Sequence, residues 1–187
     1  MSLRLAGKAF VVEVTLPAHA DVATALVAGG ARVLAVAADE AAADAVAALL
    51  GDAGFALAVD LTTADGVDAL GASVPIVLGR LDGAVLRCRG GGPAGPVAEV
   101  DDVEWRRVCA RLVEAPARAV RELAPQLEGG GVIVLVEPPA DGGATGVLLP
   151  ALRALADALD TSLGPEARVR LESGAADRDA LLAALTG

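Results

Sequence analysis

The sequence contains no tyrosine, a single lysine (Lys8) and a single histidine (His19) among its 187 residues. Any reaction that depends on a tyrosine, a second lysine or a second histidine is therefore excluded. Aromatic residues are also scarce, at 2%, whereas apolar residues make up 55%. The core must be built from valine, leucine and alanine, which favours layered helices and parallel strands over an aromatic-rich β-sandwich.

The sequence has 15 basic and 25 acidic residues, so its formal net charge is −10. An acidic surface repels nucleic-acid phosphates and anionic lipids, so we expect neither nucleic acid nor a membrane as a partner. No apolar run reaches the roughly 18 residues of a membrane helix, and the N-terminus carries no recognisable cleavable signal. Two cysteines, Cys88 and Cys109, make no disulfide framework, which favours a reducing cytoplasm. No ligand spacing supports a metal site.

Short apolar runs alternate with helical patterns along the whole chain. The runs typical of buried strands cover residues 8–14, 32–37, 55–59, 81–86, 132–136 and 167–171. The helical patterns cover residues 18–28, 39–50, 63–70, 101–127 with an interruption at Pro116, 147–163 and 177–185. Strands separated by helices predict one α/β domain over residues 1–187. We expect three layers around a doubly wound parallel sheet of about six strands.

The turn after the first strand has no glycine. In nucleotide-binding α/β folds this turn brings a diphosphate against bare backbone at a helix N-terminus, and glycine permits that close approach. Here the turn reads Thr15-Leu16-Pro17-Ala18-His19-Ala20, and the first glycine pair, Gly29-Gly30, lies beyond the helix. Because side chains stand where bare N–H groups are required, we expect no dinucleotide site here.

Six segments together resemble the short-chain dehydrogenase/reductase family, in its order and near its spacing. They are "LAGKAFVV" from Leu5, "GGARVLAV" from Gly29, "ALAVDLT" from Ala56, "GRLDGAVL" from Gly79, "GGPAGPVAEVDDVEWRRV" from Gly91 and "ALDTSLGPEARVR" from Ala158. The resemblance covers most of the chain. It implies a Rossmann fold, NAD(P) binding and hydride transfer between carbonyl and alcohol. Because the chain ends soon after the sixth strand run, we expect a member shortened at its C-terminus.

The positions that carry the chemistry of this family hold other residues here. The Tyr-x-x-x-Lys pair, in which the tyrosine transfers a proton and the lysine lowers its pKa, falls at Thr145 and Leu149. The serine position falls at Glu137 or Pro138, and the structural asparagine of the long helix falls at Leu112. We therefore expect neither the catalysis of the family nor a bound cofactor.

One acidic position of the family's cofactor site is retained. Asp60 corresponds to the residue that contacts adenine, although an aspartate at a strand end is also a common helix cap. The residue that selects between NAD and NADP falls near Ala37, and Asp39 belongs to the loop that follows. Asp60 is thus a weak cofactor candidate, valid only if a dinucleotide still binds.

The family's Asn-Ala-Gly turn reads Arg87-Cys88-Arg89, so two cationic side chains border the position of the nicotinamide. Glu137 leaves the fifth strand next to this turn. One hypothesis is that Glu137 pairs with Arg87 or Arg89 and plugs the cleft; the alternative is that each side chain is solvated. A cleft remodelled around Arg87, Arg89 and Glu137 would suit an acidic metabolite.

Two further residues are candidate reactive groups. The flanking arginines would lower the pKa of the Cys88 thiol, whereas a partly buried structural cysteine is the simpler interpretation. His19 and Asp21 would form a catalytic pair, and a histidine in the loop at a helix start is the alternative.

The two long helices carry broad apolar faces. The resemblance implies that such helices pack against a second subunit, and ordinary core packing is the alternative. The interface candidates are Trp105, Leu148, Leu152, Leu155 and Leu159. The sequence therefore predicts a non-catalytic pseudoenzyme that acts as a structural or regulatory subunit, as a homo-oligomer or in a heteromeric complex with an active family member. The alternatives are a small-molecule-binding protein or enzyme with the remodelled cleft, and a residual NAD(P)-dependent oxidoreductase.

Overall fold

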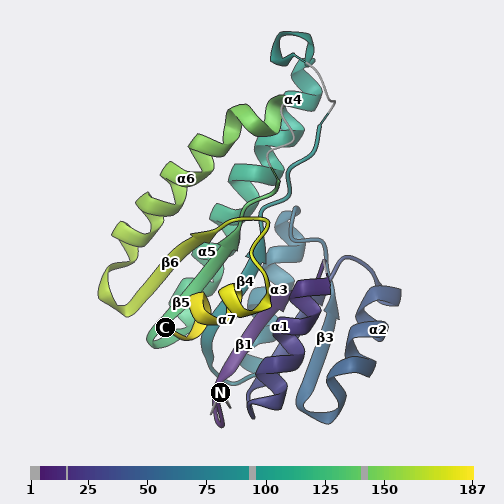
Figure 1. Ribbon diagram of the computed structural model, residues 1–187, viewed down its shortest axis with the longest axis vertical. Coiled ribbons are helices and arrows are strands. Elements are labelled where there is room, and N and C mark those ends of the chain that lie inside the picture. The colour runs from purple at the N-terminus through teal and green to yellow at the C-terminus, as the bar shows by residue number, and fades with distance from the viewer. Residues whose placement is uncertain (1–4, 16, 93–95, 140–142) are drawn as a thin grey trace.

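The computed structural model describes residues 5–15, 17–92, 96–139 and 143–187 (Figure 1). Leu16 of the glycine-free turn, the centre of the glycine- and proline-rich loop at residues 93–95, and residues 140–142 before the next helix lie outside the described residues. Six strands form one parallel sheet in the order β3-β2-β1-β4-β5-β6. The strands are β1 (Ala9–Glu13), β2 (Arg32–Ala37), β3 (Gly54–Ala58), β4 (Leu81–Arg87), β5 (Leu127–Val136) and β6 (Ala167–Glu172). The predicted doubly wound sheet is confirmed.

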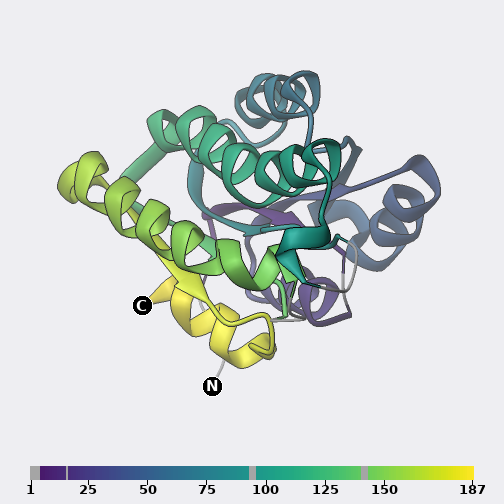
Figure 2. The ribbon, with the colours of Figure 1, turned by 90° about the horizontal axis from the view of Figure 1, so that it is seen from above.

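Helices cover both faces of this sheet (Figure 2). They are α1 (Pro17–Ala28), α2 (Glu40–Leu50), α3 (Ala64–Val77), α4 (Asp102–Cys109), α5 (Ala115–Leu123), α6 (Gly143–Leu163) and α7 (Arg178–Thr186). One apolar core lies between the sheet and α1, α2 and α7, and a second lies between the sheet and α3, α5 and α6. Burial on both faces explains why the central strands read as continuous apolar runs.

Two elements differ from their predicted extents. Helix α3 continues past residue 70 because Val67, Leu70 and Val74 keep helical spacing and all face the core. The long helix does not reach Leu127, which begins β5 instead. The predicted interruption near Pro116 takes the form of a π-helical turn (Ala110–Glu114) between α4 and α5. A proline cannot donate to the carbonyl four residues earlier, and a wider turn accommodates that loss.

The described helices include none that is both long and apolar enough to cross a bilayer.

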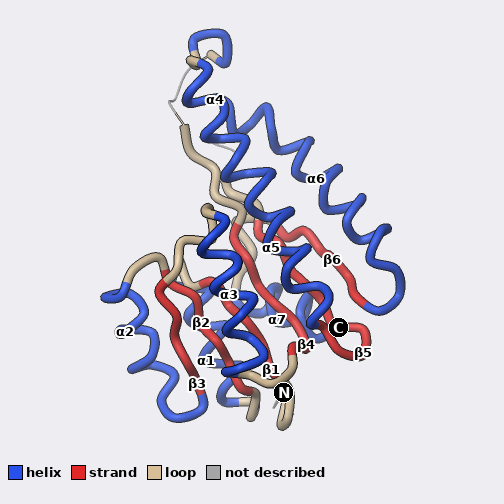
Figure 3. Tube along the Cα trace, turned by 180° about the vertical axis from the view of Figure 1, so that it is seen from behind, coloured by secondary structure: helices blue, strands red, loops and turns tan. Residues whose placement is uncertain are grey.

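The candidate site residues gather at one edge of the sheet. All the strands run the same way, so their carboxyl ends meet at one edge, where the loops after β4 and β5 lie beside the N-terminal parts of α4 and α6 (Figures 1 and 3). This edge holds most of the candidate site residues.

Candidate functional site

The sheet has a switch point between β1 and β4. The chain leaves β1 toward β2 and β3 on one side, and later returns to place β4, β5 and β6 on the other. In open α/β sheets, ligands bind in the crevice outside the carboxyl ends of the strands at such a point. Glu13 is the last residue of β1, and Arg87 is the last residue of β4.

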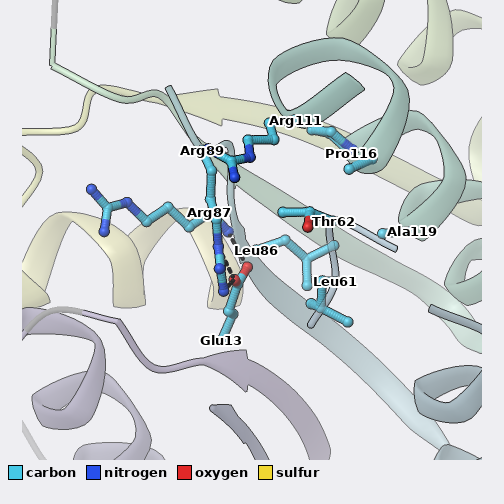
Figure 4. A pocket seen from close by; sticks show the side chains of 10 residues that line it. Glu13, Leu61, Thr62, Leu86, Arg87, Arg89, Arg111, Pro116 and Ala119 are labelled. Carbon is cyan, nitrogen blue, oxygen red and sulfur yellow. Dashed lines mark hydrogen bonds and ion pairs between the residues drawn. The ribbon is translucent and has the colours of Figure 1, made fainter. Parts of the chain in front are cut away.

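Glu13 and Arg89 form an ion pair inside this crevice (Figure 4). The Glu13 side chain is 2% exposed. Its Oε1 accepts hydrogen bonds from Arg89 Nη2 at 2.9 Å and from Arg89 Nε at 3.3 Å, and its Oε2 accepts one from the Arg87 backbone N–H at 2.8 Å. A carboxylate this deeply buried requires a cationic partner. The cavity beside the pair, walled by Leu86 and Pro116 among others, measures about 10 Å³, which is room for about one water molecule.

Glu137 does not join this cluster, so the predicted pairing of Glu137 with Arg87 or Arg89 is wrong. Its carboxylate instead accepts two hydrogen bonds from the Arg153 guanidinium on α6, at 2.7 and 3.1 Å. The solvated alternative is wrong as well, because Glu137 is held by this pair. The acidic residue that neutralises the crevice comes from β1, not from the end of β5.

Arg87 points away from the ion pair (Figure 4). Its Nη1 donates to the Thr15 hydroxyl at 3.2 Å, and it forms no ion pair with the residues that the structure describes. Arg87 and Arg89 do share one cavity of about 320 Å³, lined by these two residues with Gly90, Gly91, Pro138 and Pro139. The predicted remodelled cleft thus contains both arginines, with Glu137 turned out of it toward α6.

Asp60 closes a turn and contacts Arg89. Its Oδ1 accepts hydrogen bonds from the backbone and hydroxyl of Thr62, at 3.0 and 2.8 Å, and lies 3.7 Å from Arg89 Nη1. Burial would raise the pKa of Asp60, but the Thr62 hydrogen bonds and the charges of Arg89 and Arg111 hold it below its ordinary value. The helix cap proposed for Asp60 is supplied by Thr63, which caps α3.

Asp39, expected in the loop after β2, is the cap of α2. Its carboxylate accepts a hydrogen bond from the Ala42 N–H at 2.9 Å, as aspartate at a helix N-terminus commonly does. The side chain is therefore engaged by the backbone of its own helix.

The residues at the family's tyrosine, lysine and asparagine positions, Thr145, Leu149 and Leu112, are buried and contribute to packing and to hydrogen bonding within the fold. Thr145 accepts a hydrogen bond from the Gly91 N–H at 3.0 Å, which ties the loop after β4 to α6. Leu149 and Leu112 lie in the core on that side of the sheet. A leucine supplies no charge, and the Thr145 hydroxyl is a far weaker acid than a tyrosine.

His19 and Cys88 are buried as well. Burial lowers the pKa of His19, the Arg87 charge lowers it further, and a hydrogen bond to the Glu13 carbonyl opposes both. The described part of the chain shows no hydrogen bond between His19 and Asp21. Burial raises the pKa of the Cys88 thiol, as do the charges of Glu13 and Glu137. The reactive interpretation of Cys88 is therefore wrong, and the structural one fits. The described residues contain no cluster of three or more potential metal ligands.

The interface candidates divide into core and surface. Leu152 is wholly buried and cannot reach a partner, so its assignment to an interface is wrong. Leu148 and Leu159 are partly buried against the same core. Trp105 on α4 and Leu155 on α6 remain partly exposed. The apolar side chains most exposed on these two helices are Val103, at 65%, and Val147, at 55%.

Comparison with known proteins settles the family. The model of the short chain dehydrogenase family matches residues 20–141, which is more than half of the chain. The chain belongs to this family. The match begins at Ala20, the last residue of the glycine-free turn, and ends before Thr145.

Solved structures share the fold. A short-chain dehydrogenase/reductase (glucose/ribitol dehydrogenase) from Brucella melitensis is 23% identical with a TM-score of 0.81, over 92% of this chain and 77% of that one. The 3-ketoacyl-(acyl-carrier-protein) reductase from Brucella melitensis, solved with NADH, is 24% identical with a TM-score of 0.77, over 89% and 74%. L-sorbose reductase from Gluconobacter frateurii, solved with NADPH and L-sorbose, is 25% identical with a TM-score of 0.73, over 87% and 66%.

The switch-point crevice of this chain does not fit a dinucleotide. Binding a diphosphate at a helix N-terminus needs backbone N–H groups and space at the switch point. Helix α1 begins at Pro17, which has no backbone N–H. Glu13, at the end of β1, and Arg89 hold each other in a buried ion pair, so the Arg89 guanidinium is already engaged and the pair occupies the switch point. Arg89 supplies the cation and Glu13 the anion at the switch point, so the site is filled by side chains of the chain itself.

Proposed function

We propose that this chain is a non-catalytic short-chain dehydrogenase that acts through association, with a second copy of itself or with an active member of the family. The observation that carries the proposal is the buried ion pair of Glu13 and Arg89 at the switch point. The pair stands where a dinucleotide of the family would need an uncharged, glycine-lined path. A chain that fills this space with its own side chains is expected to have no hydride donor or acceptor.

The lack of a proton donor supports the same conclusion. The hydroxyl of Thr145 is buried and already engaged by the Gly91 N–H. The sequence has no tyrosine, and its one lysine, Lys8, pairs with Asp82 near the amino end of the sheet. General acid–base catalysis requires a titratable group within reach of the substrate, and the family's tyrosine and lysine positions, Thr145 and Leu149, provide none here.

The association half of the proposal rests on α4 and α6. Helix α4 and the N-terminal part of α6 lie side by side beyond the carboxyl edge of the sheet, and the rest of α6 runs alongside β6 (Figure 1). They expose Val103 and Val147, with Trp105 and Leu155 partly exposed. Exposed apolar side chains are candidates for protein–protein contacts, and aromatic residues are enriched at such contacts. We call these four residues the α4/α6 surface.

Sedimentation analysis over a range of protein concentrations tests this surface. We expect the wild-type chain to associate at micromolar concentrations, or to co-sediment with an active family member when mixed. Val147→Asp should weaken the association by about tenfold or more, which is 1.4 kcal/mol or more. Ile76→Asp is the matched control, because Ile76 is 84% exposed on α3, away from the α4/α6 surface. A chain that stays monomeric both alone and in the mixture would contradict the proposal.

A further inference from the structure

We propose that the cleft between the loops after β4 and β5 binds a small monocarboxylic acid, with the Arg87 guanidinium as its cationic partner. This β4–β5 cleft is the cavity of about 320 Å³ lined by Arg87, Arg89, Gly90, Gly91, Pro138 and Pro139. Its size lies near the lower end of the range of small-molecule sites, which is about 300–1,000 Å³. The inference is independent of the proposed association, because a subunit without catalysis can still carry a ligand.

The charge balance around the cleft singles out Arg87. Arg89 is neutralised by Glu13, at 2.9 Å. Glu137, on the other side, is neutralised by Arg153, at 2.7 Å. Among the residues that the structure describes, Arg87 has only the Thr15 hydroxyl as a side-chain partner. Arg89 also lies 3.7 Å from the Asp60 carboxylate. Arg87 is thus the cation of the cleft lining that has no acidic partner among the described residues, in a chain whose net charge is −10.

The chemistry of a guanidinium favours a carboxylate. Its planar set of N–H donors matches the two oxygens of a carboxylate, and such bidentate pairs are among the stronger hydrogen-bonded contacts in proteins. A phosphate dianion is less suitable, because the Glu13 carboxylate accepts a hydrogen bond from the Arg87 backbone and so lies close to the same site. The single positive charge of the Arg87 guanidinium matches one negative charge on the ligand.

The remaining walls indicate a small apolar body. Pro138 and Pro139 offer apolar rings, while Gly90 and Gly91 have no side chains to occupy the space. The Gly91 N–H is held by the Thr145 hydroxyl, which fixes this wall. A Cβ atom at Gly90 would lie 2.8 Å from a Thr145 carbon and 2.9 Å from a Pro138 carbon, so the close packing of the wall requires glycine. A short aliphatic acid such as propionate has the matching charge and shape.

Titration of the full-length protein with sodium propionate, at constant ionic strength against sodium chloride, tests the proposal. Two-dimensional NMR follows the backbone amides of Gly90 and Gly91. We expect saturable shifts of these two amides at millimolar propionate. Arg87→Gln should weaken the binding by at least tenfold, and Arg87→Lys should weaken it less because it keeps the charge without the planar fork. Arg106→Gln is the matched control, since it removes the same charge from an exposed position on α4.

Several outcomes would overturn the inference. These are the absence of any saturable shift up to about 50 mM propionate, an equal response to chloride or inorganic phosphate, and unchanged propionate binding by Arg87→Gln. If Arg87→Gln does not fold, the comparison of Arg87→Lys with wild type decides, and equal affinity would reject the role of the guanidinium. Sedimentation of the same samples measures association separately, so failure of one proposal leaves the other distinguishable.

Discussion

The Glu13 carboxylate and the Arg89 guanidinium meet at 2.9 Å in the crevice where the strand order of the sheet reverses. Glu13 comes from the end of β1, and Arg89 lies two residues beyond the end of β4. The two strands that define the switch point are thus joined by charges of this chain. This pair occupies the crevice in which other members of the family would hold a dinucleotide.

Removing the charge of Glu13 should destabilise the fold. Glu13→Gln leaves the Arg89 cation without its buried partner, and breaking a buried pair in this way typically costs about 3 kcal/mol or more. Urea denaturation at neutral pH measures the loss. Glu137→Gln is the control, because its partner Arg153 is 59% exposed and such surface pairs contribute about 1 kcal/mol or less. Equal losses in the free energy of unfolding for the two variants would show that the Glu13 pair stabilises the fold no more than a surface ion pair does.

The Asp82 carboxylate should make the protein acid-sensitive. Burial would raise its pKa, but hydrogen bonds from Arg80, Lys8 and the Ala9 N–H outweigh burial and hold the pKa below the ordinary 3.8. Because the folded pKa is depressed, the stabilisation is present above pH 3.8 and is lost as the pH falls through the folded pKa. Asp82→Asn should lower the free energy of unfolding at neutral pH and flatten its decline in acid. An unchanged acid slope would refute the assignment.

The two cysteines should differ in reactivity. Cys88 is wholly buried and burial raises the pKa of its thiol, whereas Cys109 is partly exposed. Because the thiolate is the reactive form, a thiol reagent at about pH 8 should label Cys109 well before Cys88, with both labelled in denaturant. Mass spectrometry of peptides measures the order. Rapid native labelling of Cys88 would restore the reactive interpretation.

Thr145 should be needed for stability through its hydroxyl. Thr145→Val keeps the shape but leaves the Gly91 N–H without its acceptor, which typically costs about 1–3 kcal/mol for a buried group. Thr145→Ser keeps the acceptor and should retain more of the stability than Thr145→Val. Thermal unfolding of the two variants checks the order, and the reverse order would remove the structural role given to this hydroxyl.

The sheet and its helices could be predicted from the sequence because each central strand is buried on both faces and reads as one apolar run. The ends of the helices and strands were harder to predict where the local residue pattern and the tertiary packing favour different elements. Leu127 fits the apolar spacing of the preceding helix, yet the chain has already turned into β5. The π-helical turn before Pro116 reflects the missing N–H of that proline. The proline predicts that the helix is interrupted, but not that the interruption is a π-helical turn.

The site was predicted less well because side-chain partners depend on packing between distant segments. Glu137 precedes Arg153 by sixteen residues, and only the docking of α6 brings the two together. Glu13 was missed although it carries a usable signal: a carboxylate inside an otherwise apolar strand needs a buried cation. Arg87, at the end of β4, and Arg89 both line the β4–β5 cleft, and their role in binding a ligand stays a prediction.

Titration of the purified protein with NADH and NADPH, followed by thermal unfolding, measures whether the crevice binds a dinucleotide. A dinucleotide present at a hundred times its dissociation constant would stabilise the fold by about 2.7 kcal/mol, which is a rise of about 5–10 °C in Tm for a chain of this size. We expect no rise in Tm at millimolar concentrations of either nucleotide. A clear, saturable rise would mean that the crevice still accepts the cofactor despite Glu13, Arg89 and Pro17, and that the dinucleotide site is retained.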